Sequence, residues 1–270
     1  MSGQTGQDRM SMRLAKIAGI AGLALLASCS ANRGDTTGSI PKTSRPLEQM
    51  TQPELAAVSR SVGDRYAKNP KDRNAGLQYA TLLRMTGKNA QALAVMRQIA
   101  ILYPRDREVL AAYGKAQASA GELEQALGTI NRAQTPDRPD WKLKSAEGAI
   151  LDQLGRAEEA RAAYRDALDI KPNEPSVLSN LGMSYLLTRD LKTAESYMRS
   201  AISQPGADSR VRQNLALVVG LQGRFQEAEN IARQELTAEQ AEANMTYLRA
   251  MLSQDNSWKK LAAKDDGNTN

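Results

Sequence analysis

The sequence predicts an all-α protein, a right-handed superhelical solenoid of antiparallel helical hairpins. Three observations predict it: a period of 34 residues, small residues at fixed positions in each period, and a glycine where four of the five hairpins must turn. A single helical hairpin cannot bury its own apolar face, so it must stack on copies of itself. We therefore expect one elongated array of hairpins.

The period is read by numbering residues 141–174 from 1 to 34. Position 20 is alanine in five consecutive copies: Ala92, Ala126, Ala160, Ala194 and Ala228. Position 8 is small in the same copies: Ala80, Gly114, Gly148, Gly182 and Ala216. We expect two helices to cross closely here, because a larger side chain would push them apart. Larger apolar residues at position 24 fill the gaps: Met96, Ile130, Tyr164 and Met198.

The ends of the expected helices carry matching signals. Position 15 is Gly87, Gly121, Gly155 and Gly223, with Arg189 in the fourth copy, and glycine takes the left-handed geometry after a helix without steric cost. Position 34 is acidic: Asp106, Asp140, Glu174, Asp208 and Glu242, with Asp72 one period earlier. A carboxylate there accepts from free backbone N–H groups at the start of the next helix. The whole pattern resembles the tetratricopeptide repeat.

This period divides most of the chain. We expect an N-terminal capping helix in residues 51–72, opened by a capping box of Thr51 and Glu54. Five repeats follow, at 73–106, 107–140, 141–174, 175–208 and 209–242. The helical pattern continues from Ala238 to Ser253 past the fifth repeat. We therefore expect a closing helix, which the repeat count bounds at 243–262, and a disordered tail at 263–270. Residues 29–50 are rich in Gly, Ser, Thr and Pro and predict a disordered tether.

Residues 1–28 have the pattern of an export signal peptide. Arg13 and Lys16 precede an apolar run at 17–26, which is shorter than the about 20 residues that span a bilayer. The run ends in Leu-Ala-Ser-Cys, which resembles the lipobox of bacterial lipoproteins and implies lipid on Cys29. Cys29 is the only cysteine, so a free thiol or an intermolecular disulfide is the alternative. In enterobacterial lipoproteins, an aspartate after the acylated cysteine favours retention in the inner membrane. Ser30 stands at that position here, so we expect anchoring on the periplasmic face of the outer membrane.

Composition excludes several classes of function. The chain has no histidine, and its one cysteine lies at the expected cleavage site, which excludes Ser-His or Cys-His catalysis and imidazole or thiolate metal sites. The glycines follow the repeat period and form no phosphate-binding loop. The net charge of +6 comes from 36 basic and 30 acidic residues without a dense basic run. We therefore expect no enzyme, no cofactor, no metal and no nucleic-acid partner.

In tetratricopeptide proteins, positions 2, 5, 6, 9, 12 and 13 face a concave groove. The resemblance therefore implies a peptide-binding groove made of Asn180, Met183, Leu186, Leu187, Asn214, Leu217 and Leu221. Asparagine can bond a partner's backbone amides, and the apolar side chains can bury its anchors. We expect both asparagines to face solvent in the free protein. The alternative for Leu186 or Leu217 is packing between neighbouring helices.

One resemblance extends beyond the repeats. Residues 211–236 and the segment NMTYLRAML at 244–252 resemble the C-terminal half of the TadD lipoproteins of the Flp/tight-adherence (Tad) pilus assembly system. The lipobox, the tether and the repeats match that family in order and size. The resemblance implies a non-enzymatic, pilotin-like assembly factor that binds the pilus secretin or other Tad machinery. The alternative is a general periplasmic adaptor that organises envelope or peptidoglycan enzymes.

Overall fold

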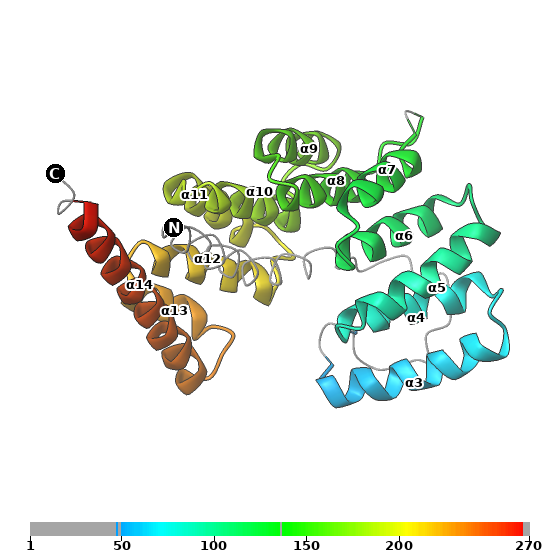
Figure 1. Cartoon of the computed structure of the whole chain (residues 1–270), viewed down its shortest axis with the longest axis horizontal. Helices are drawn as coiled ribbons and strands as arrows, with labels where there is room; N and C mark the ends of the chain where they lie inside the picture. Colours follow the sequence, from blue (N-terminus) through cyan, green and yellow to red (C-terminus); the bar gives the residue numbers. More distant parts are fainter. Residues whose placement is uncertain (1–46, 48–49, 136, 267–270) are drawn as a thin grey trace, which may run out of the picture. The chain divides into compact units, whose positions relative to one another are not determined.

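The computed structural model describes residues 47, 50–135 and 137–266 (Figure 1). Within these residues the regular structure is helical, apart from one isolated antiparallel bridge between Thr135 and Arg138. The predicted all-helical class is therefore confirmed. The expected signal peptide, Cys29, nearly all of the expected tether and residues 267–270 of the tail lie outside the described residues.

The chain forms two compact units, which divide between residues 170 and 171. In the first unit the capping helix α3 spans Gln52–Lys68. Three hairpins follow it: α4 (Arg73–Met85) with α5 (Asn89–Leu102), α6 (Arg107–Ser119) with α7 (Leu123–Ala133), and α8 (Trp141–Gln153) with α9 (Ala157–Ile170). Each helix packs on the next along the chain, so this unit is a stack of hairpins.

The second unit contains α10 (Pro175–Leu187), α11 (Leu191–Ile202), α12 (Ser209–Leu221), α13 (Phe225–Ala232) and α14 (Ala238–Asp266). The last helix extends past both ends of the expected range 243–262, and Glu242 lies inside it rather than before it. The cause is a capping box: the Thr237 N–H donates to Gln240 Oε1 at 3.1 Å, and the Gln240 N–H donates to Thr237 Oγ1 at 3.2 Å.

The close helix crossings predicted from the small residues are confirmed. All five alanines at position 20 are fully buried, with 0% exposure. A Cβ atom added to Gly148 would lie 2.7 Å from Tyr164 Cε1, and one added to Gly114 would lie 2.8 Å from Ile130 Cγ1. These distances are shorter than van der Waals contact, so position 8 needs its small side chain wherever position 24 is large.

The turns and the helix starts follow the predicted chemistry, apart from Arg189 at position 15 and Glu174 at position 34. The four position-15 glycines have φ between +72° and +86°, and Arg189 adopts the same left-handed geometry at φ +64°. The aspartates at position 34, and Asp72, accept from backbone N–H groups of the next helix. Glu174 makes no such cap: it accepts from Ser176 Oγ at 2.8 Å, and the next residue is Pro175, which has no N–H.

The expected capping box of Thr51 and Glu54 is present at the start of α3. The Thr51 N–H donates to Glu54 Oε2 at 2.7 Å, and the Thr51 hydroxyl donates to the same oxygen at 2.8 Å. A carboxylate in the first turn also complements the helix dipole. The first helix of the array therefore begins at the residue that the sequence indicates.

Candidate protein-binding surface

The predicted groove residues lie on two neighbouring helices of the second unit. Helix α10 carries Asn180, Met183, Leu186 and Leu187, and α12 carries Asn214, Leu217 and Leu221. These two helices pack against each other. The structure thus brings together side chains that stand one period apart in the sequence.

The two asparagines do not form an open pair. Asn180 is buried, with 6% of its surface exposed. Asn214 is half-buried, and its Nδ2 donates to Ser179 Oγ on α10 at 3.1 Å. The expectation that both face solvent in the free protein is therefore wrong, because position 6 of α12 points at the neighbouring first helix. A partner backbone would have to displace existing contacts to reach these amides.

The apolar residues divide into two kinds. Met183, Leu186, Leu217 and Leu221 are half-buried and pack against a core cluster that includes Met198, Leu215 and Val218. Leu187, the last residue of α10, is 41% exposed. Leu186 and Leu217 therefore pack partly between helices, as the alternative for these two residues predicts. Leu187, in contrast, exposes a large part of its apolar surface to solvent. Binding of a partner by these residues stays a prediction.

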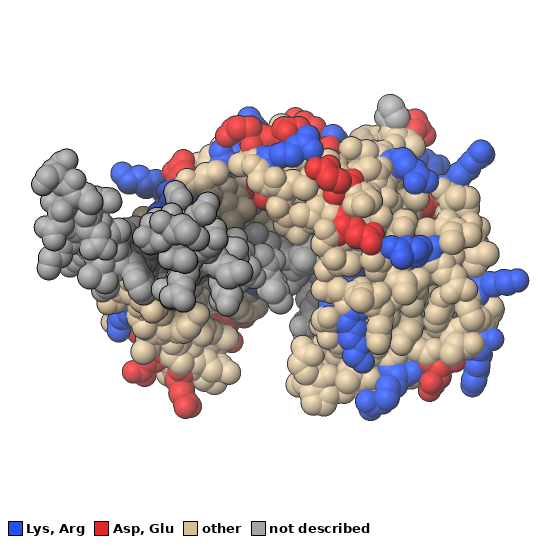
Figure 2. Space-filling view, in the orientation of Figure 1, with Lys and Arg blue, Asp and Glu red and all other residues tan. Residues whose placement is uncertain are grey.

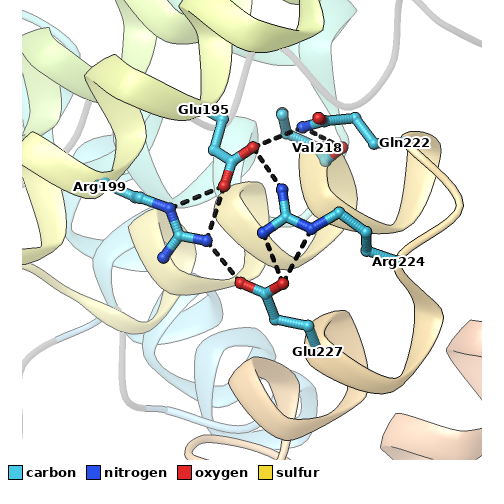
Figure 3. A network of polar contacts seen from close by, with 6 residues as sticks. All are labelled: Glu195, Arg199, Val218, Gln222, Arg224 and Glu227. Carbon is cyan, nitrogen blue, oxygen red and sulfur yellow. Dashed lines mark hydrogen bonds and ion pairs between the residues drawn. The ribbon is translucent and has the colours of Figure 1, made fainter.

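A polar network joins the fourth hairpin to the fifth (Figure 3). Glu195 of α11 accepts from Arg199 Nε, from Gln222 Nε2 and from Arg224 Nη1, each at 2.7 Å. Glu227 of α13 pairs with both guanidinium groups, at 2.5 Å each. The network therefore links α11, the end of α12 and α13.

The network holds the carboxyl group of Glu195 in its ionised form. Burial alone would raise the pKa of Glu195, but the hydrogen bonds from Gln222, Arg224 and Arg199 outweigh it and lower the pKa to about 2. A carboxylate held so strongly in its ionised form is a poor general base. The sequence contained a signal for this site in the Glu195–Arg199 spacing of four residues and the Arg224–Glu227 spacing of three, but it gave no means of joining the two pairs.

The described part of the chain offers neither a metal-binding cluster nor a membrane-spanning helix. No three Asp, Glu or Cys side chains there are grouped so that they could hold a metal ion. None of the described helices combines the length and the apolar character needed to cross a membrane.

Comparison with protein families places the repeats. Residues 78–140 match the family described as tetratricopeptide repeat, and residues 148–188 match the family described as TPR repeat. These two matched segments carry tetratricopeptide repeats. The stacked hairpins of the chain are therefore a scaffold of the kind that mediates contacts between proteins.

Curated relatives match only through part of their length. The cellulose synthase operon protein C of Pseudomonas fluorescens is 25% identical over 52% of this chain and 12% of its own. The human aspartyl/asparaginyl beta-hydroxylase is 25% identical over 70% of this chain and 26% of its own. This chain thus spans about a quarter or less of these relatives.

Solved structures share the fold. A thermophilic TPR protein of Thermus thermophilus is 22% identical, with a TM-score of 0.56 over 62% of this chain and 91% of the other. PilW, described as a widely conserved type IV pilus biogenesis factor, is 18% identical, with a TM-score of 0.56 over 76% of this chain and 94% of the other. A tetratricopeptide repeat protein of Parabacteroides merdae is 11% identical, with a TM-score of 0.63 over 73% and 79%.

Proposed function

We propose that this chain is a non-enzymatic lipoprotein scaffold for assembly of the Flp/Tad pilus. It acts like a pilotin and binds the pilus secretin or another component of the Tad machinery through the second unit. The observation that carries partner binding is a set of apolar side chains on α10 and α12 that are exposed or half-buried. We call this set the strip: Met183, Leu186, Leu187, Leu217 and Leu221. The assignment to a pilus is supported by the resemblance to the TadD lipoproteins and by the fold shared with PilW.

The strip suits an apolar helix or extended segment of a partner. Leu187 is 41% exposed, and Met183 and Leu221 are half-buried, so they also keep part of their surface accessible. Anchor residues that fill such a strip bury apolar area, which is the main source of affinity in helix-in-groove recognition. Because no charged residue belongs to the strip, we expect binding to depend weakly on salt.

Anchoring is the second part of the proposal. Acyl chains on Cys29 would hold the chain on the periplasmic face of the outer membrane, since more than one chain gives durable attachment. The test is Cys29→Ala followed by membrane fractionation. We expect an unprocessed precursor or a soluble periplasmic form; mature-sized variant in the outer membrane would contradict the proposal.

The partner surface is tested with a matched pair of substitutions in one unit. Leu187→Asp changes the strip, and Met251→Asp changes an apolar residue of α14 with nearly the same exposure, 42% against 41%. We expect Leu187→Asp to abolish capture of the secretin from crosslinked membranes, with a thermal melt like that of the parent chain. Met251→Asp should keep capture.

Retained capture by Leu187→Asp would contradict the strip. If the partners lost were instead enzymes of peptidoglycan synthesis, the alternative of a general periplasmic adaptor would replace the pilus scaffold. Leu217→Asp serves as a third variant: because Leu217 packs against the core cluster, we expect it to lower the melting temperature as well.

A further inference from the structure

Two turns of the first unit lie side by side along one edge. The turn at 69–72 joins α3 to α4, and the turn at 103–106 joins α5 to α6. The Tyr103 hydroxyl donates to the backbone oxygen of Lys71 at 2.9 Å, and Arg73 Nε donates to Asp106 Oδ2 at 2.7 Å. We call these turns, with the last residues of α3 and α5, the turn edge; its outward side chains are Lys68, Lys71, Ile101, Leu102 and Arg105.

The turn edge is cationic on its outer side. Lys68, Lys71 and Arg105 are exposed, and among the described residues none of their side chains has a carboxylate partner. The two carboxylates of the turns are used elsewhere. Asp72 accepts from the first N–H groups of α4, and Asp106 accepts from the start of α6 and from a guanidinium group. The positive charges of Lys68, Lys71 and Arg105 are therefore available to attract an anionic surface that faces the edge.

Two apolar side chains accompany these cations. Ile101 is 75% exposed and Leu102 is 41% exposed, and they are the last residues of α5, directly before the cationic turn. A single exposed apolar residue needs no explanation. Two of them beside three cations that pair with no carboxylate of the described residues form the combination that peripheral proteins use to bind at a membrane surface.

The excess of positive charge is concentrated in the residues that form α3 to α5. Residues 52–107 contain 10 Lys or Arg and 4 Asp or Glu, whereas residues 108–266 contain 20 and 23. Figure 2 shows blue side chains outnumbering red ones over the region of α3 to α5, at the lower right. The attraction to an anionic surface is therefore a local property of α3–α5, not of the chain as a whole.

We infer that the turn edge binds the headgroups of an anionic phospholipid bilayer. The cations lie at the lipid phosphates, and Ile101 and Leu102 enter the boundary between headgroups and acyl chains. This inference rests on the proposed anchoring at Cys29. If residues 30–50 form the tether that their composition predicts, a flexible chain of that length has a root-mean-square span of about 25 Å. The 17 residues of α3 add about 25 Å, which would keep the edge within reach of the bilayer.

The test measures binding of the chain from Ser30 to Asn270, which lacks the signal and the acylated residue and keeps both described units. Its affinity is measured by cosedimentation with vesicles of phosphatidylglycerol and phosphatidylcholine in equal parts, and with vesicles of phosphatidylcholine alone. The edge variant is Lys71→Glu with Arg105→Glu. The control is Lys88→Glu with Lys192→Glu, which makes the same change of charge at two lysines away from the edge.

We expect binding to the anionic vesicles only. A basic residue near such a surface contributes roughly fivefold in affinity for each unit of charge, so the edge variant should bind roughly a hundredfold or more weakly, and the control much less so. Ile101→Ser should weaken binding about tenfold by removing an inserted side chain. Circular dichroism and the thermal melt should be the same for all variants.

Equal loss of affinity in the edge variant and the control would overturn the inference, as would failure of the parent chain to bind the anionic vesicles. Unchanged affinity of Ile101→Ser for the anionic vesicles would also overturn it, because the inference requires this side chain to enter the bilayer. None of these results involves a pilus component or an acyl group. The proposed scaffold function and the anchoring at Cys29 therefore stand or fall by their own tests.

Discussion

Gly148→Ala tests the close crossing on which each hairpin depends. The new Cβ would lie 2.7, 2.8 and 2.9 Å from three ring atoms of Tyr164. That ring is 2% exposed, and its hydroxyl is held by Asp152 Oδ2 at 3.0 Å, so it has little room to move. Overpacking of this kind costs about 1 to 3 kcal/mol. Against it stands the gain of about 1 kcal/mol when alanine replaces glycine inside a helix.

Gly128→Ala supplies the matched control. Gly128 also lies inside a helix, α7, but its added Cβ would meet no atom within 4 Å. We expect Gly128→Ala to raise the free energy of unfolding by the helix-propensity gain of about 1 kcal/mol. The free energy of unfolding of Gly148→Ala should be about 1 to 3 kcal/mol lower than that of Gly128→Ala. Urea titration followed by circular dichroism measures both. If the two variants are stabilised equally, the predicted overlap with Tyr164 does not exist.

Three further substitutions test single features of the structure. Arg189→Gly should raise the free energy of unfolding by about 1 kcal/mol, because φ +64° strains an exposed L-residue; an unchanged urea midpoint would speak against strain. Gln117→Leu should stabilise by about 1 to 2 kcal/mol, because no group of the described residues donates a hydrogen bond to the buried Oε1; destabilisation would show that the amide is satisfied. The lowered pKa of Glu195 contributes stability above the ordinary value of 4.5, which is lost as pH falls towards about 2. Over that window the parent chain should therefore lose more stability than Glu195→Gln, and parallel curves would refute this.

Much of the fold could be predicted because its determinants recur in the sequence at one period. The alanines at position 20 and the glycines at position 15 each report a local geometric need, a close crossing or a left-handed turn. Such needs do not depend on distant parts of the chain. The phase of the hairpins could therefore be read from residue type alone, and even Arg189 adopts the geometry that its position demands.

The candidate surface was harder to predict, because exposure depends on which neighbour a side chain meets. Asn180 and Asn214 occupy positions that face the groove in other repeat proteins, yet one is buried and the other donates to Ser179. Residue type gives no sign of this. The helical pattern from Ala238 onward indicated the start of α14, whereas the period of 34 residues alone favoured a later boundary.

The short helix α13 has a consequence for how the second unit opens. It has 8 residues, about two turns, and α14 packs on α12 beside it: a Cβ added to Gly220 of α12 would lie 2.5 Å from Leu248 of α14. The fifth hairpin thus depends on α14 for part of its covering layer. In an array with nearest-neighbour coupling, detachment of α14 must come before exposure of α12. Amide hydrogen exchange should therefore show α14 and α13 losing protection together, before α10 and α11.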